Sequence, residues 1–170
     1  TQSDIIIDTT AMKTEELQEY LTSRFGAVDK KREMQITLFS FGFKYGIPID
    51  ADMVIDVRFL KNPFYIEKYK HWTGRVPEVA RYISESPVTE KFLDKLYDFM
   101  DFTVDHFRDA GKTQFTIAIG CTGGMHRSVF VTETLGNHLK EQHTHVNVEH
   151  RDLHRNRIEK DVDDLAEDKK

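Results

Sequence analysis

The residues of this chain whose types and spacing could do chemistry are concentrated in 116–131, T-I-A-I-G-C-T-G-G-M-H-R-S-V-F-V. Gly123 and Gly124 would let the backbone approach a ligand closely, and the guanidinium of Arg127 offers a planar pair of donors that suits phosphate. An apolar run before these residues predicts a buried parallel strand, and apolar residues at a helical period from Ser128 predict a helix. Because the first N–H groups of a helix lack intrahelical partners, such a loop favours an anion.

The same loop matches the pattern C-x-x-G-x-x-R-S of the cysteine phosphatases, from Cys121 to Ser128. In that pattern a thiolate at the start of a helix attacks phosphorus, and the arginine holds the phosphate oxygens. Gly120 stands where a histidine usually precedes the cysteine. Three interpretations stay open: an anion site without chemistry, which we favour, a phosphatase that uses Cys121 and Arg127, and a tight structural turn. We expect no phosphatase turnover, because no nearby acid stands in a pattern that marks a proton donor.

Length and composition predict a soluble globular protein with a sizeable core. The chain has 170 residues, of which 39% are hydrophobic, and no apolar run approaches the ~18 residues of a membrane span. Its single cysteine excludes an intrachain disulfide and fits the reducing cytoplasm. The formal net charge of −5 argues against general affinity for nucleic acid. The eight histidines show no zinc-ligand spacing, so we expect no metal site.

Hydrophobic periodicity predicts the elements that must hold the loop in place. Strands are expected over residues 4–8, 34–41, 53–60, 115–119 and 146–148. Helices are expected from Thr14 to about Gly26, over 77–84, from Pro87 to Gly111 and from Ser128 onward. This alternation predicts an α/β fold with a mainly parallel sheet flanked by helices. The loops 42–52 and 120–127 should then converge at the C-terminal ends of the strands.

Two of these elements carry side chains that the core must accommodate. Asp56 and Arg58 lie two residues apart in an expected strand, and therefore on one face. They either form an internal ion pair or serve a ligand. The long helix should pack on the core through an apolar stripe, formed by Phe92, Leu96, Phe99, Thr103 and Phe107 and widened by Leu93, Met100 and Val104.

Two other regions could contact nucleic acid. Segment 62–74 interleaves aromatic residues with lysine and histidine, which could stack bases but more often cover the edge of a core. Residues 149–157 hold three arginines against two acids, whereas 158–170 hold three lysines against six acids. The arginines either belong to a solvated tail or contact a phosphate backbone. They are Arg151, Arg155 and Arg157.

Several long motifs in the chain resemble one known family. They are S-F-G-F-K-Y-G-I-P-x-D-A-D, D-V-R-F-L-x-N-P, I-G-C-T-G-G-x-H-R-S-V and H-R-D-L. Together they are similar to the C-terminal domain of the RapZ/YvcJ family of nucleotide-binding proteins and RNase adapters, over roughly residues 33–157. The segment D-I-I-I-D-T-T and the helix after it resemble the end of that family's N-terminal P-loop domain.

The resemblance implies a division of the chain into three parts. Residues 1–30 would be the last strand and helix of the P-loop domain with a linker, 31–157 the ligand-binding domain, and 158–170 a polar acidic tail. In the family the P-loop domain binds and slowly hydrolyses ATP or GTP. No Walker A loop is present here, so we expect neither that activity nor a cofactor in this chain. The resemblance also implies a homo-oligomer for the full-length protein.

The family's C-terminal domain is implicated in sensing an amino-sugar phosphate and, in one branch, in presenting a small regulatory RNA to an RNase. This branch has histidine at the positions of Tyr45 and Phe64 and a basic tail, so metabolite sensing fits this chain better than RNA binding. We expect Arg127→Ala to abolish ligand binding and to leave the fold intact. The ligand-binding residues implied by resemblance are Lys44, Asp56, Arg58, Cys121, Thr122, Gly123, Gly124, His126, Arg127 and Ser128.

Overall fold

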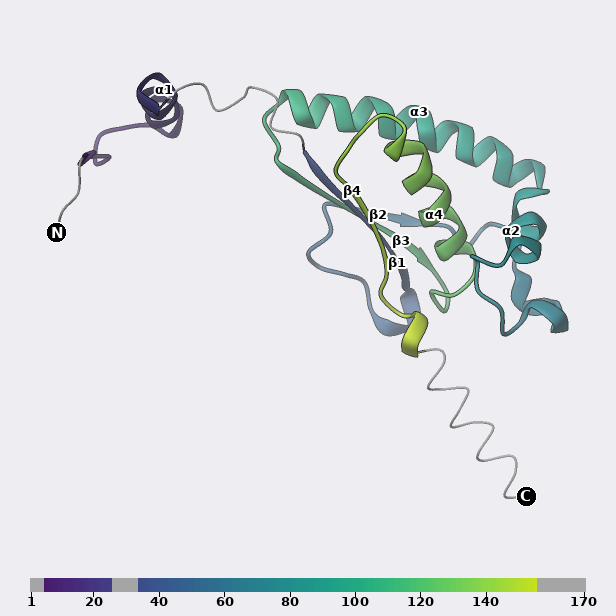
Figure 1. Cartoon of the computed structure of the whole chain (residues 1–170). Helices are drawn as coiled ribbons and strands as arrows, with labels where there is room; N and C mark the ends of the chain where they lie inside the picture. Colours follow the sequence, from purple (N-terminus) through teal and green to yellow (C-terminus); the bar gives the residue numbers. More distant parts are fainter. Residues whose placement is uncertain (1–4, 26–33, 156–170) are drawn as a thin grey trace, which may run out of the picture. The chain divides into compact units, whose positions relative to one another are not determined.

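The computed structural model describes residues 5–25 and 34–155, whose elements are labelled in Figure 1. The chain divides into two compact units, Thr1–Arg32 and Glu33–Lys170. The acidic tail expected over 158–170 lies outside the described residues. No helix in the described part of the chain is long and apolar enough to cross a membrane.

The first unit contains the predicted helix but not the predicted strand. Helix α1 spans Thr14–Phe25, and the carboxylate of Glu16 accepts a hydrogen bond from the N–H of Lys13 at 2.9 Å. Lys13 is therefore the capping position of this helix. The strand expected over 4–8 is wrong, because the described residues 5–8 form no strand. A strand needs a neighbour for its backbone donors and acceptors, and the described part of this unit offers none.

The second unit is built on one all-parallel sheet with the strand order β2-β3-β1-β4, which confirms the predicted α/β fold. Strands β1 and β3 are central, and their register pairs Gly42 with Cys121. These two strands therefore end level with each other, so that the segments that follow them begin side by side. The strands span Gln35–Gly42 (β1), Met53–Asp56 (β2), Gln114–Cys121 (β3) and Val146–His150 (β4).

Strand β2 is shorter than the predicted run of 53–60. It pairs with β3 from Met53, opposite Ile117, to Asp56, opposite Gly120. One further hydrogen bond, from the N–H of Val57 to the carbonyl of Gly120 at 2.9 Å, ends the pairing. Because β3 itself ends one residue later, the residues after Val57 have no strand to pair with, and of the two apolar ones Leu60 is buried in the core whereas Phe59 is 58% exposed.

The three predicted helices of this unit are confirmed. They are α2 (Pro77–Ser84), α3 (Pro87–Asp109) and α4 (Arg127–Lys140), and short 3₁₀ turns occupy Phe43–Tyr45, Pro63–Tyr65 and Glu67–Tyr69. In Figure 1 α4 runs over the strands and α3 along one border of the sheet. The core joins one face of the sheet, represented by Leu38 and Ile117, to apolar residues of these helices such as Met100 and Leu135.

The packing face of α3 differs from the predicted stripe. Leu96, Met100 and Val104 are buried, whereas Phe99 is 51% and Phe107 39% exposed. The apolar residues of this helix span more of its circumference than its contact with the sheet and with α2 and α4 can cover. The buried residues lie four apart along the helix, starting at Leu96. The residues of the predicted stripe lie three or four apart and follow a different line on the helix surface.

Candidate anion-binding site

The predicted loop lies between the C-terminal end of β3 and the start of α4, but it begins two residues later than expected. Gly120 and Cys121 still belong to the strand. Gly120 is needed there for packing, since a Cβ atom on it would lie 2.5 Å from the ring of Phe41 and 2.6 Å from that of Phe43. The glycine therefore accommodates two aromatic rings over the strand rather than breaking it.

The end of β1 and the loop are in direct backbone contact. A Cβ atom on Gly42 would lie 2.7 Å from the carbonyl carbon of Gly123 and 3.0 Å from the nitrogen of Gly124. Gly124 has a φ of 71°, and a Cβ atom there would lie 2.6 Å from the nitrogen of Gly42. The N–H of Lys44 donates to the carbonyl of Thr122 at 3.2 Å. The two loops therefore converge as predicted, and no side chain can be added at the contact.

Cys121, the last residue of β3, and Ser128, in the first turn of α4, contact each other inside the protein. The Sγ and Oγ atoms are 3.1 Å apart, and both residues are buried. A thiol enclosed in this way is not presented to solvent, so a phosphate ester would reach Sγ only if the loop opened. The geometry therefore favours a structural role for this pair over a role of Cys121 as a nucleophile.

Arg127 contacts the protein core, which corrects the expectation that its guanidinium serves a ligand alone. The side chain is 5% exposed, and Nη1 donates to the carbonyl oxygens of Arg58 and Leu60. Nη2 donates to Oγ1 of Thr122 at 3.3 Å. Nε is buried and, among the described residues, has no hydrogen-bond partner. Arg127 thus fixes the turn after β2 against the loop, and its replacement should affect the fold.

His126 also holds a neighbouring segment. It precedes α4 and is 7% exposed, and its Nε2 lies 3.0 Å from the carbonyl oxygen of Tyr69. Burial lowers the pKa of His126, and the adjacent Arg127 charge acts in the same direction. The neutral ring can donate to the Tyr69 carbonyl. The N–H of Gly74 donates to the carbonyl of Met125 at 2.9 Å, so segment 69–74 is bound to the loop at two points.

Asp56 and Arg58 form an ion pair, which was one of the two alternatives, but the pair lies at the surface rather than inside the protein. The closest atoms are 2.6 Å apart, and the side chains are 49% exposed for Arg58 and 44% for Asp56. The hydrogen bond from Arg58 holds the pKa of Asp56 below its usual range. The guanidinium also lies 4.1 Å from the ring centroid of Phe43. The ten predicted ligand residues therefore all lie at, or just beyond, the C-terminal ends of β1, β2 and β3.

Segment 62–74 mostly covers the edge of the core. Tyr69 and Trp72 pack against the core, and Lys68 lies 5.4 Å from the ring of Trp72. Phe64 and Tyr65 are 51% and 82% exposed. Only these two rings present a large apolar surface of the kind that a base could stack on.

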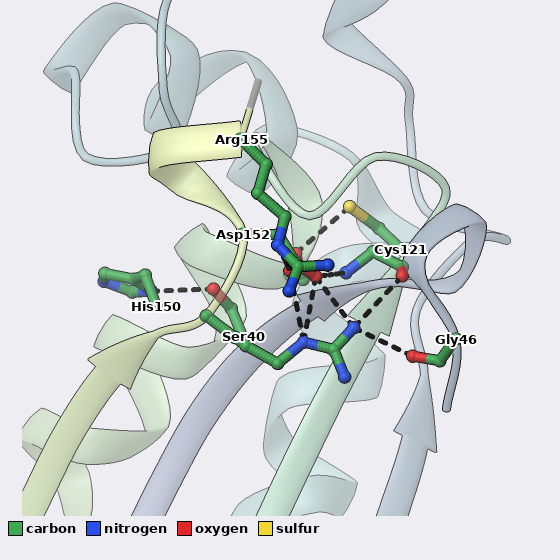
Figure 2. Close-up of polar contacts among 9 residues, drawn as sticks. Ser40, Gly46, Cys121, His150, Asp152 and Arg155 are labelled. Atoms are coloured by element: carbon green, nitrogen blue, oxygen red, sulfur yellow. Dashed lines mark hydrogen bonds and ion pairs between the residues drawn. The ribbon is translucent and has the colours of Figure 1, made fainter. Parts of the chain in front are cut away.

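The sequence did not point to Asp152 as a functional residue. It was counted only as one of the two acids in segment 149–157. Its side chain is fully buried, and Oδ2 accepts a hydrogen bond from the N–H of Gly42 at 2.8 Å. Arg151 donates to the same carboxylate from Nη2 at 2.9 Å, and Nε of Arg155 lies 3.6 Å from it (Figure 2). The available signal was the motif H-R-D, which begins at the last residue of β4. Arg157 lies outside the described residues.

A second network of polar side chains is centred on His150, whose side chain is buried. Its Nδ1 lies 2.7 Å from Oγ of Ser40 and its Nε2 3.0 Å from Oε1 of Glu133, which also pairs with Arg75. Burial lowers the pKa of His150. The order of groups is that of a hydrolytic triad, but Ser40 is fully buried and cannot meet a substrate. These hydrogen bonds join β1, β4 and α4.

Comparison with known proteins gives a consistent result. Residues 34–154 match the family model described as the RapZ C-terminal domain. A nucleotide-binding protein of Caldicellulosiruptor saccharolyticus is 46% identical over 160 residues, which cover 94% of this chain and 53% of that protein. A nucleotide-binding protein of Bacillus thuringiensis is 48% identical over 152 residues, covering 89% and 51%. The chain spans about half the length of the curated relatives it matches.

Proposed function

The chain belongs to the RapZ family through its C-terminal domain, and from this premise we propose that it is a regulatory domain that binds a phosphorylated metabolite. The ligand would lie at the loop of residues 121–128, and we propose an amino-sugar phosphate as its chemical class. The domain would bind this ligand without converting it.

The observation that carries the proposal is the backbone packing of Gly42 on Gly123 and Gly124. It holds the loop close to the end of β1 with no side chain in the contact. The loop leads directly into α4, a helix of 14 residues. The first N–H groups of such a helix lack intrahelical acceptors, and its dipole is positive at this end, so both features favour a phosphate.

Side chains at the same edge suit the two ends of an amino-sugar phosphate. The half-exposed guanidinium of Arg58 can approach phosphate oxygens. An oxygen placed in the loop could also supply the acceptor that Nε of Arg127 lacks. The carboxylate of Asp56, 44% exposed, would pair with a sugar ammonium, and the Thr122 hydroxyl would bond to a ring hydroxyl.

Calorimetric titration of the chain with glucosamine 6-phosphate, glucosamine and inorganic phosphate tests the proposal. We expect the phosphosugar to bind most tightly and, at ~100 times its Kd, to add roughly 2.7 kcal/mol to the free energy of unfolding. Gly124→Ala is the matched loss-of-binding variant, because its Cβ atom would strike Gly42 and strain a φ of 71°. No heat and no thermal shift with any of the three compounds would contradict the proposal.

We predict that the chain does not hydrolyse phosphate esters. The Sγ atom of Cys121 is enclosed against Ser128, and a leaving group would also need a proton donor. Release of p-nitrophenol from its phosphate ester should therefore equal the buffer rate for the wild-type chain and for Cys121→Ser. Turnover that is present in the wild type and disappears in Cys121→Ser would establish the phosphatase alternative.

We predict weak or undetectable RNA binding by this chain at physiological salt. Arg151 and Arg155 direct their guanidinium groups to Asp152, and the formal net charge is −5. If these two and Arg157 did contact phosphates, the log–log salt dependence should have a slope of about −2 to −3. A gel-shift titration measures both quantities, with Arg108→Ala as the control. Sub-micromolar affinity that is lost when the three arginines are replaced would support the RNA-adapter alternative.

For the whole protein we propose the family's other properties. The relatives are named nucleotide-binding proteins, and ATP or GTP would bind to a P-loop domain outside residues 34–154. We further propose a homo-oligomer that acts in the cytoplasm and, after sensing the metabolite, contacts a protein partner. Size-exclusion chromatography with light scattering, with and without nucleotide, would test the assembly.

A further inference from the structure

Asp152 lies where a buried charge could control the candidate site without touching its ligand. Its side chain is fully buried, at 0% exposure. Burying a carboxylate costs free energy unless it is hydrogen-bonded and paired. Here it accepts from the N–H of Gly42 at 2.8 Å and from the guanidinium of Arg151, and Arg155 lies beside it. Figure 2 shows Asp152 between Arg155 and the end of the strand that carries Cys121.

The bond from Gly42 connects this carboxylate to the loop. Gly42 is the last residue of β1, and its backbone packs on Gly123 and Gly124 so closely that a Cβ atom would not fit. Gly42 therefore cannot shift without moving the loop. The position of Gly42 is fixed on one side by the ladder to β3 and on the other by Asp152.

Arg151 extends this arrangement to the turn after β1. Its N–H donates to the carbonyl of Ser40 at 3.0 Å, and its Nη2 donates to the carbonyl of Gly46 at 2.8 Å. Nη2 also bonds to Asp152 at 2.9 Å. Nη2 lies 3.5 Å from the carbonyl oxygen of Gly42 as well. The single guanidinium thus joins the buried carboxylate to both ends of the segment 42–46, which includes Lys44.

We infer that Asp152 is a positioning residue for the loop of residues 121–128. Through Gly42 and Arg151 it sets the position of segment 42–46 and, through the glycine contact, of Gly123 and Gly124. This inference rests on the proposed function, since it assigns to that site a residue that regulates its geometry. Because Asp152 is fully buried, its effect on a ligand must pass through the groups that it holds, which are the backbone of Gly42 and the guanidinium groups of Arg151 and Arg155.

Two substitutions at this position distinguish the hydrogen bond from Gly42 from the negative charge that pairs with the arginines. Asp152→Ala removes the acceptor for Gly42 and the partner of both arginines. Asp152→Asn keeps an oxygen that can accept from Gly42, but it places an amide donor against the arginines. The matched control is Asp98→Asn, the same change at an exposed position of α3.

Hydrogen–deuterium exchange of the full chain is the first readout, because it needs no ligand. We expect peptides covering 121–126 to exchange about tenfold faster in Asp152→Ala than in the wild type, while peptides of α3 stay unchanged. Asp152→Asn should fall between the two and Asp98→Asn should match the wild type. Alkylation of Cys121 by iodoacetamide should follow the same order.

Titration with glucosamine 6-phosphate is the second readout, with an expected loss of affinity of about tenfold in Asp152→Ala and partial recovery in Asp152→Asn. Unchanged exchange in 121–126, a uniform rise over the whole sheet, or unchanged affinity in a variant whose loop is loosened would each overturn the inference. If the wild type binds no phosphosugar while the loop of Asp152→Ala still exchanges faster, the proposed function fails and the positioning of the loop by Asp152 stands.

Discussion

Replacement of Gly74 by alanine is expected to destabilise the protein by about 3 kcal/mol or more. The new Cβ atom would lie 2.1 Å from the carbonyl oxygen of His126 and 2.6 Å from the nitrogen of Phe130. These two atoms form a hydrogen bond at the start of α4, with a length of 2.9 Å. Since both belong to the backbone, neither can move without displacing the helix. Urea unfolding followed by the fluorescence of Trp72, the single tryptophan, measures the loss.

Gly136→Ala provides the control for this prediction, because Gly136 lies in α4, the helix whose start Gly74 contacts. Its Cβ atom would also be too close to a neighbour, 2.4 Å from Cγ2 of Val148, but that neighbour is the end of a side chain and can move. The gain in helix propensity, about 1 kcal/mol, offsets part of the cost. If Gly74→Ala were no less stable than Gly136→Ala, the close packing of segment 69–74 on the loop would not be required for the fold.

Arg127→Ala should lower the free energy of unfolding by about 2–5 kcal/mol, in addition to weakening ligand binding. The guanidinium supplies donors to the carbonyl oxygens of Arg58 and Leu60 from a side chain that is 5% exposed. The substitution leaves these acceptors without their donor and opens a cavity. Urea unfolding measures the loss of stability, and titration with glucosamine 6-phosphate measures the loss of binding.

Arg108→Ala is the comparison, because Arg108 pairs with Asp105 at 2.8 Å but is 41% exposed. A surface pair of this kind contributes ~1 kcal/mol at most. The difference in unfolding free energy between the two variants therefore measures how much more a buried guanidinium contributes to stability than an exposed one. The Arg127→Ala variant could instead be as stable as the wild type and bind no phosphosugar. That result would show that this guanidinium serves the ligand and does not stabilise the fold.

Much of the architecture could be predicted from the sequence because it depends on local patterns. Apolar periodicity and helix-starting prolines located α2 and α3, and the β-branched run in β3 marked a buried parallel strand. Each pattern reflects a preference of a short segment for one backbone conformation. The spacing of the glycines and Arg127 likewise located the loop, since a close backbone approach needs glycine wherever the chain folds.

Features that depend on a partner could not be predicted in this way. Residues 5–8 have the composition of a strand but, in the described part of their unit, no neighbour to pair with. The pairing of β2 stops one residue before β3 ends, and the buried face of α3 follows its contact with the sheet rather than its own apolar stripe. In each case the outcome depends on which surface lies opposite, and that surface comes from a distant part of the chain.

The candidate site divides in the same way. The sequence by itself determined that a glycine-rich loop joins a strand to a helix, because glycine, arginine and apolar spacing carry that information locally. Only the tertiary structure decided the parts played by Arg127 and Asp152. Arg127 contacts carbonyl groups 67 and 69 residues away in the chain, and Asp152 accepts from Gly42 across 110 residues. A charged side chain acquires its partners from the fold, and no pattern of neighbouring residues specifies them.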